Sequence, residues 1–241
     1  MATNKSKKVN FTEFLKNVFF PKFCFGCGRV GTYLCPECTS KLQIIDRDIC
    51  AICEKASYFG LTHNNCKKRY SIDGLKSFFV YEGLAKKIIT KIKYQLVSES
   101  IDDLVATINI ESFKKITDFC NLFPGVILIP VPLHEKRKAM RGFNQSEYIF
   151  SIIAQKLGIE IKNNLVMRTK HTDPQAHMKS PRARMENVKG AFEISENVKD
   201  RSFIICDDVW TTGSTIKEIT LLLKQNGAKK VCALTIARVY V

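Results

Sequence analysis

Apolar residues fall into two alternating patterns along the chain from about residue 71 onward. Mainly apolar runs, typical of strands buried on both faces, stand at 75–81, 126–131, 203–206 and 231–236. Between these runs, apolar residues recur every three or four positions, which predicts helices over 84–94, 101–119, 143–157 and 214–225. Strands that alternate with helices in this way indicate an α/β fold, with a mostly parallel sheet covered on both faces.

The first seventy residues lack this alternation, and their composition changes twice. Residues 1–20 combine a polar, basic start with an apolar stretch from Phe11 to Phe20, which predicts a basic tail and a short amphipathic helix. Residues 21–70 are rich in cysteine, and residues 71–241 carry the alternating pattern. We therefore expect a tail, a small cysteine-rich module and an α/β domain, in that order.

The chain has 241 residues, of which 45% are hydrophobic, so it can bury a full core beside a small module. Its formal charge of +15 predicts polyanionic partners, namely nucleic acid, phosphorylated metabolites or acidic membrane surfaces. No apolar run approaches the roughly 18 residues that a membrane span requires. We expect a cytoplasmic protein, in which the ten cysteines serve as metal ligands or buried thiols rather than disulfides.

Four closely spaced pairs of potential metal ligands stand in the cysteine-rich module. They are Cys24 and Cys27, Cys35 and Cys38, Cys50 and Cys53, and His63 and Cys66. A pair separated by two residues can reach one zinc ion, and two pairs complete a tetrahedron. Because protein side chains fill all four coordination positions of the ion, this pattern predicts structural rather than catalytic zinc.

The pairs can combine in more than one way. Sequential pairing gives one site from the first two pairs and a second site from the last two, whereas interleaved pairing also fits the spacing. His63 is the weakest ligand, since a surface histidine is the alternative interpretation. The module has too few large apolar residues to fold by burial alone, and structural zinc can supply roughly 10–16 kcal/mol. The remaining cysteines lie in apolar segments, where inert thiols are expected: Cys120, Cys206 and Cys232.

The most specific pattern follows the apolar run at 203–206. Two adjacent acids, Asp207 and Asp208, come directly after it, and a helical pattern begins at Ser214. The intervening turn and helix start are rich in hydroxyl groups: Thr211, Thr212, Gly213, Ser214 and Thr215. Amides at a helix N-terminus attract anions and hydroxyl groups add donors, so this segment predicts a phosphate site. The acids are placed to accept hydrogen bonds from sugar hydroxyls or to meet Mg²⁺.

A basic segment follows the apolar run at 126–131 and precedes the helix predicted at 143–157. Its cations and amides converge within ten positions: Lys136, Arg137, Lys138, Arg141, Asn144 and Gln145. We expect a loop at the same sheet edge as the acids, able to bind a diphosphate through bidentate donors. A solvated basic surface loop is the alternative interpretation.

A third polar block runs from Arg168 through Thr172, Gln175 and Arg184 to Phe192. Its low apolar content predicts a long mobile loop, and such loops can close over a bound substrate.

Taken in order, these segments resemble the ComF family, amidophosphoribosyltransferase-like proteins linked to DNA uptake in natural transformation, with GntX-type relatives. The resemblance rests on the chelating pairs, Lys93-Tyr94, Pro130 to His134, Arg141 to Gln145, the third block, and Asp207-Asp208 with Thr212-Gly213. The string from Phe203 to Thr215 also resembles the phosphoribosyl pyrophosphate (PRPP) motif of type I phosphoribosyltransferases. The resemblance implies a double zinc ribbon at residues 21–70 and a type I phosphoribosyltransferase-like domain at residues 71–241.

The same resemblance implies a role for each matching residue. Asp207 and Asp208 would be the catalytic pair that holds the ribose hydroxyls, with Mg²⁺ bound alongside PRPP. The 5-phosphate would lie on Thr211 to Thr215, and the pyrophosphate on Arg137, Arg141, Asn144, Gln145 and Lys93. Two residues depart from the family pattern: His63 replaces a common cysteine, and Trp210 replaces an aliphatic residue.

The sequence leaves three functions open. One is transfer of phosphoribosyl to an unknown acceptor, and another is binding of single-stranded DNA with PRPP as a ligand only. Nucleobase salvage is the third, although Thr211 stands where oxopurine enzymes usually carry an acid. Lys170, His171, His177 and Lys179 are alternative proton acceptors, and other DNA-uptake proteins are expected partners.

Overall fold

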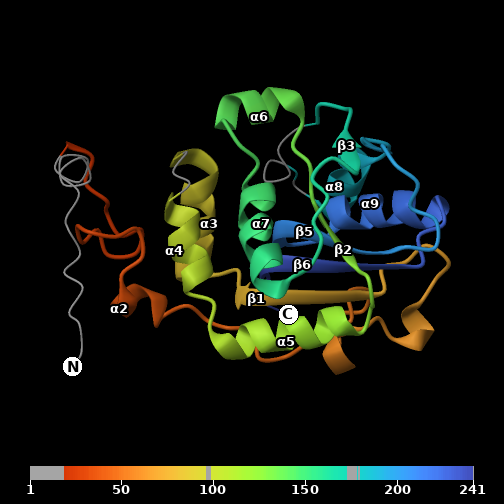
Figure 1. Cartoon of the computed structure of the whole chain (residues 1–241), viewed down its shortest axis with the longest axis horizontal. Helices are drawn as coiled ribbons and strands as arrows, with labels where there is room; N and C mark the ends of the chain where they lie inside the picture. Colours follow the sequence, from red (N-terminus) through yellow and green to blue (C-terminus); the bar gives the residue numbers. More distant parts are fainter. Residues whose placement is uncertain (1–18, 96–98, 173–177, 179, 241) are drawn as a thin grey trace, which may run out of the picture.

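The protein is described by a computed structural model that covers residues 19–95, 99–172, 178 and 180–240 (Figure 1). Its central sheet contains β1 (Gly74–Val80), β2 (Ile127–Pro130), β5 (Ser202–Trp210) and β6 (Lys230–Arg238). The strand order is β1-β6-β5-β2, and every neighbouring pair is parallel. The prediction of an α/β fold with a parallel sheet is confirmed, and the four apolar runs form its four strands.

Helices cover one face of this sheet, and a mixed layer covers the other (Figure 1). The first face packs against α3 (Gly83–Gln95), α4 (Glu99–Ala106), α5 (Ile110–Asn121) and α7 (Gln145–Leu157). The second packs against α9 (Ser214–Gln225) and the antiparallel pair β3 (Val166–Arg168) and β4 (Phe192–Ile194). Alternate residues of β5 serve the two faces: Ile204 and Cys206 belong to the first core, and Phe203 and Ile205 to the second.

Three segments differ from the sequence prediction. The single helix expected at 101–119 is two helices, because Asn109 starts a new one by accepting a hydrogen bond from the Ser112 amide at 2.8 Å. The expected basic loop contains a helix, α6 (Glu135–Arg141), which ends at Gly142 with φ of 72°. The expected long loop contains β3, α8 (Pro181–Val188) and β4, where Ser180 caps α8.

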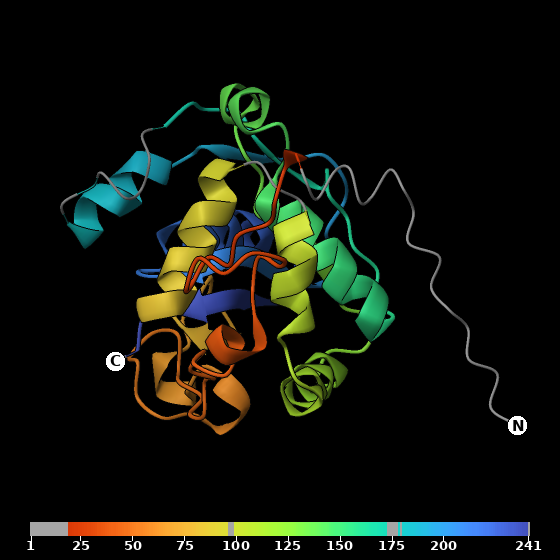
Figure 2. The same ribbon diagram turned by 90° about the vertical axis from the view of Figure 1, so that its left-hand side faces the viewer.

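The cysteine-rich module packs against the α/β domain in two places. Its first half lies against α3 and α4, where Lys87 Nζ donates to the Gly26 carbonyl and Asp103 accepts from the Thr32 hydroxyl (Figure 2). Its second half bridges to the start of β1 through Leu61 and Gly74. It contains α2 (Pro36–Thr39), η1 (Tyr58–Gly60) and η2 (Asn64–Cys66). Residues 1–18 of the predicted tail and amphipathic helix lie outside the described residues.

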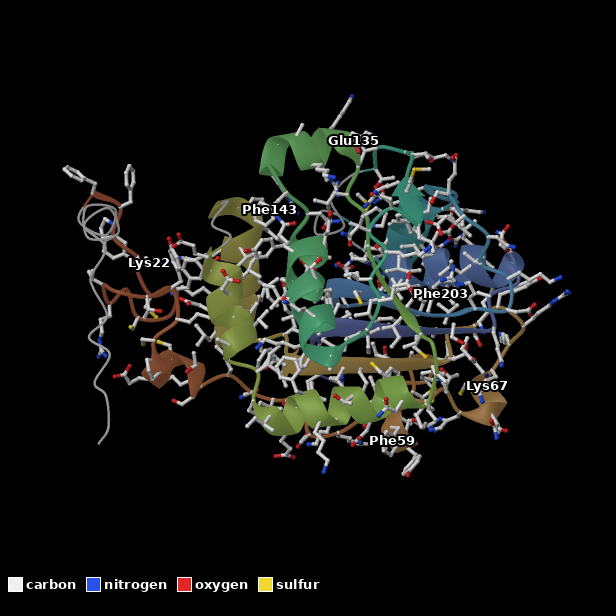
Figure 3. All side chains as sticks on the ribbon, viewed as in Figure 1. Lys22, Phe59, Lys67, Glu135, Phe143 and Phe203 are labelled. Atoms are coloured by element: carbon white, nitrogen blue, oxygen red, sulfur yellow. The ribbon has the colours of Figure 1, made fainter. Side chains whose placement is uncertain are left out.

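Among the described residues, no helix is long and apolar enough to cross a membrane. In Figure 3, Glu135 at the start of α6 lies at the top, and Phe59 and Lys67 of the second half of the cysteine-rich module lie toward the bottom. The second half of the cysteine-rich module is therefore remote from α6.

Candidate functional site

Eight ligand side chains form two clusters, each built from sequential pairs. Cys24, Cys27, Cys35 and Cys38 form the first, and Cys50, Cys53, His63 and Cys66 form the second. Within each cluster the ligand atoms all lie within 4.8 Å of one another, as one tetrahedral ion requires. The geometry selects sequential pairing, and four thiol or imidazole ligands per cluster fit structural zinc.

His63 has the geometry of a metal ligand. Its Nε2 lies 2.9 Å from the carbonyl oxygen of Ala56, and its Nδ1 lies 3.4 Å from Cys53 Sγ. A carbonyl oxygen can only accept, so the proton sits on Nε2 and leaves the Nδ1 lone pair facing the cluster. Ligating histidines in zinc sites are commonly oriented by this kind of outer hydrogen bond. This geometry favours His63 as a metal ligand over a surface histidine.

The two acids lie inside a strand rather than after its end. The strand expected at 203–206 continues as β5 to Trp210, so both acids belong to this strand, and both contact helices on the first face of the sheet. Lys93, on the last turn of α3, places its Nζ 2.7 Å from Asp208 Oδ2. Asp207 Oδ1 accepts from the Ser146 hydroxyl at 3.1 Å and from the Asp208 amide at 2.8 Å.

This environment changes how Asp207 ionises. Burial raises the pKa of Asp207 to about 7, and the neighbouring charge of Asp208 adds to the effect, while Lys93 opposes it. Burial acts to lower the pKa of Lys93, but Asp208 more than offsets it, and the net direction is upward. A carboxylate that titrates near neutral pH within a polar cluster is a common mark of a functional site.

The start of α7 lies beside Asp207. Asn144 caps the helix by accepting from the Ser146 amide at 3.1 Å, and its own amide donates to the Val131 carbonyl at 3.0 Å. Asn144 therefore positions Ser146 against Asp207. Gln145 is buried and accepts from Arg141 Nη1 at 3.3 Å, but its Nε2 has no hydrogen-bond partner among the described residues. A buried donor of this kind is costly unless a ligand satisfies it.

The basic residues divide into two groups. Arg141 stacks over the Tyr94 ring at 5.7 Å, which brings α6 to the end of α3 that carries Lys93. Arg137 instead donates from Nη2 to the Thr172 carbonyl at 2.6 Å, and the Arg168 guanidinium donates to the Thr172 hydroxyl. Burial lowers the pKa of Arg168 to about 10, and the nearby Arg137 charge acts in the same direction. Two guanidinium groups held so close favour an anion between them.

The hydroxyl-rich turn is held by residues beneath it. Gly213 has φ of 67°, and a Cβ atom there would lie 2.4 Å from the buried Trp210 ring, so only glycine fits. Lys217 lies 5.4 Å from that ring and donates from Nζ to the Thr212 carbonyl at 2.8 Å. Trp210 packs in the core on the second face of the sheet. Thr212 and Ser214 hydroxyls lie 2.7 Å apart.

Four residues outside the predicted binding set lie in this cluster: Ser146, Arg168, Arg184 and Lys217. Arg184 on α8 donates to the Thr211 hydroxyl at 3.2 Å, so α8 lies against the hydroxyl-rich turn. Ser146 directly follows the Asn144-Gln145 pair, and Lys217 stands one helical turn after Gly213. Those two spacings were visible in the sequence, whereas the contact of Arg184 depends on the fold.

Two domain families match the chain. Residues 15–68 match the Double zinc ribbon domain, and residues 144–239 match the Phosphoribosyl transferase domain. The second match contains the acids, the hydroxyl-rich turn and the start of α7. The structure and these matches agree on a zinc-ribbon module followed by a type I phosphoribosyltransferase-like fold.

Three curated relatives match between 43% and 86% of the chain. Competence protein F of Haemophilus influenzae is 28% identical over 224 residues, which cover 86% of this chain and 97% of that protein. Competence protein ComFC of Bacillus subtilis is 24% identical over 220 residues, covering 85% of this chain and 84% of that protein. DNA utilization protein YhgH of Escherichia coli (strain K12) is 41% identical over 104 residues, covering 43% of this chain and 45% of that protein. The chain thus spans about half the length of this last relative.

Proposed function

The chain belongs to the ComF family of competence-associated, phosphoribosyltransferase-like proteins, and from this premise we propose that it binds PRPP together with Mg²⁺ and acts in DNA uptake. We assign the zinc ribbons to residues 21–70 and the PRPP-binding domain to residues 71–241. Other DNA-uptake proteins are the partners that this role implies.

One observation carries the proposal: the acid pair and the hydroxyl-rich turn are consecutive parts of β5 and the start of α9. A pentose 5-phosphate needs acceptors for its ring hydroxyls and donors for its phosphate, a few ångströms apart. Asp207 and Asp208 supply the acceptors, and the turn from Thr211 to Thr215 supplies hydroxyl and amide donors. The proposal therefore rests on hydrogen-bond acceptors for a sugar lying next to hydrogen-bond donors for a phosphate.

The diphosphate has a separate group of donors. Lys93 contacts Asp208, and Arg141 donates a hydrogen bond to Gln145 at the start of α7. Arg137 and Arg168 both donate hydrogen bonds to Thr172. Oxygen ligands suit Mg²⁺, so the adjacent carboxylates fit this ion. Mg²⁺ would supply charge neutralisation for the diphosphate.

If the protein is an enzyme, a nucleophile would displace diphosphate from carbon 1 of PRPP. The bond from carbon 1 to the diphosphate oxygen breaks, and a bond from carbon 1 to the acceptor forms. The protein would contribute by positioning both groups and by stabilising the charge on the departing diphosphate. Thr211 stands where oxopurine phosphoribosyltransferases usually carry an acid, and its hydroxyl accepts a hydrogen bond from Arg184. The lack of an acid at this position disfavours nucleobase salvage.

Binding of single-stranded DNA is the second candidate, and the exposed surface of the first zinc ribbon favours it. Phe19, Phe20 and Phe23 are all more than half exposed, and Lys22 and Arg29 stand nearby in the chain. Aromatic rings beside cations can stack nucleobases while the cations contact phosphates. The charge of +15 is in keeping with this role.

Isothermal titration calorimetry with PRPP tests the primary proposal. We expect one site per chain whose affinity depends on Mg²⁺, and a loss of binding of at least tenfold when both acids become asparagine. Unchanged affinity in that double variant would remove the sugar-holding role. A screen of acceptors for diphosphate release then separates an enzyme from a PRPP-binding accessory factor, and added salt should weaken binding of single-stranded DNA steeply.

A further inference from the structure

Lys93 lies beside the acid pair, at the place where the Mg²⁺ that accompanies PRPP would bind. Its Nζ lies 2.7 Å from Asp208 Oδ2, and 26% of its side chain and 13% of the Asp208 side chain remain exposed. Asp207 Oδ1 accepts hydrogen bonds from the Ser146 hydroxyl and from the Asp208 amide. Among the described residues, Lys93 is thus a cation that contacts Asp208 and also acts electrostatically on Asp207.

Two carboxylates without that lysine would attract a divalent cation. Adjacent acidic oxygens repel each other, and a hard cation such as Mg²⁺ or Mn²⁺ relieves this repulsion by binding them. An ammonium group at hydrogen-bond distance competes directly for the same oxygen. The ligand-free protein should therefore bind a divalent cation weakly at this place.

The surroundings determine where the lysine can go. Lys93 sits on a flexible four-carbon chain on the last turn of α3, and the next residue, Tyr94, stacks under Arg141 of α6. A lysine that left Asp208 in this direction would meet another cation. The movement becomes favourable when an anion, such as a diphosphate, arrives between Lys93 and Arg141.

We propose that Lys93 is an exchangeable counter-ion: it leaves Asp208 for the diphosphate when a phosphosugar brings its own divalent cation to the acids. This inference rests on the proposed function and names a positioning residue within the same site. It explains why Lys93 contacts Asp208 although the family resemblance implies that it binds the pyrophosphate. It also gives an order of events, because the cation enters with the phosphosugar and not before it.

Mn²⁺ binding in the absence of any phosphosugar tests this inference. Zinc-loaded full-length protein would be titrated with Mn²⁺, and free Mn²⁺ measured by electron paramagnetic resonance. We expect Lys93→Met to bind Mn²⁺ at least tenfold more tightly than the wild type, and Lys93→Arg to resemble the wild type because it keeps the charge. Adding Asp208→Asn to Lys93→Met should abolish the gain, which excludes the cysteine clusters as its source.

Lys86→Met is the matched control, since Lys86 is exposed on the same helix. Thermal melts establish that each variant is folded, and Lys93→Gln replaces Lys93→Met if the latter is not. Equal Mn²⁺ affinity in the wild type and in both neutral variants overturns the inference, as does a gain in Lys93→Arg. A gain in the neutral variants, without PRPP binding by any protein, supports Lys93 as the counter-ion of the acids but overturns both its exchange for a phosphosugar and the proposed function.

Discussion

Replacing Asp207 with asparagine should stabilise the ligand-free protein while it weakens PRPP binding. Burial and the charge of Asp208 raise the pKa of Asp207 from 3.8 to about 7, so the fold disfavours its ionised form. Asparagine has nearly the same shape, and its Oδ1 can still accept from Ser146 and from the Asp208 amide. Lys93 keeps its partner, since Asp208 is unchanged.

The size of the effect follows from linkage between ionisation and folding. One pKa unit corresponds to about 1.4 kcal/mol, so the full rise sets a ceiling of roughly 4 kcal/mol. Asp207 retains contact with solvent and the asparagine amide needs partners of its own, so we expect about 1–2 kcal/mol. For a chain of this length, that gain corresponds to roughly 3–6 °C in Tm.

The sign of the pH dependence is fixed by the direction of the pKa change. Because the folded pKa lies above the unfolded value, protonation favours the folded state, and this stability is fully present only below about pH 4. It is lost as pH rises toward the folded pKa of about 7. The advantage of Asp207→Asn should therefore be full above pH 7 and shrink steadily between pH 7 and pH 4.

Thermal unfolding of zinc-loaded protein at pH 8 and at pH 5 measures both features. Asp103→Asn is the control, because Asp103 is a partly buried carboxylate that accepts from the Thr32 hydroxyl and the Tyr33 amide. We expect that control to leave Tm unchanged or to lower it. The reasoning fails if Asp207→Asn gives no gain at pH 8, or an equal gain at both pH values.

Three further variants probe the rest of the account. Cys24→Ser should lower zinc content from two ions to about one per chain, measured by mass spectrometry, whereas Cys120→Ala should retain both; full zinc content in Cys24→Ser contradicts the ligand set. Gly213→Ala should destabilise by roughly 2 kcal/mol in urea and weaken ribose 5-phosphate binding, because its Cβ meets the Trp210 ring; wild-type stability refutes this packing argument. Arg137→Ala should weaken PRPP binding more than ribose 5-phosphate binding, and equal losses would remove Arg137 from the diphosphate group.

The parts of the fold with strong apolar periodicity could be predicted from sequence. The four strands and α7 and α9 bury continuous or one-sided apolar surfaces, so their patterns follow their burial directly. The basic helix α6 has no buried residue, and its pattern therefore carried no apolar signal. The split between α4 and α5 depended on one capping residue, Asn109, inside an otherwise helical pattern.

The candidate site divides in a similar way. Asp207, Asp208 and the hydroxyl-rich turn are consecutive, so the sequence reveals them together. The pairing of Lys93 with Asp208 joins positions that are far apart in the chain, and no local pattern encodes it. The role of His63 depends on its hydrogen bond to the Ala56 carbonyl, which the sequence does not show.

A crystal structure of the protein with PRPP and Mg²⁺ tests the central claim most directly. We expect the ribose hydroxyls on the carboxylates of Asp207 and Asp208, the 5-phosphate on the turn from Thr211 to Thr215, and Lys93 turned toward the diphosphate. A phosphosugar bound elsewhere, with Lys93 still on Asp208 and the turn empty, would contradict the account.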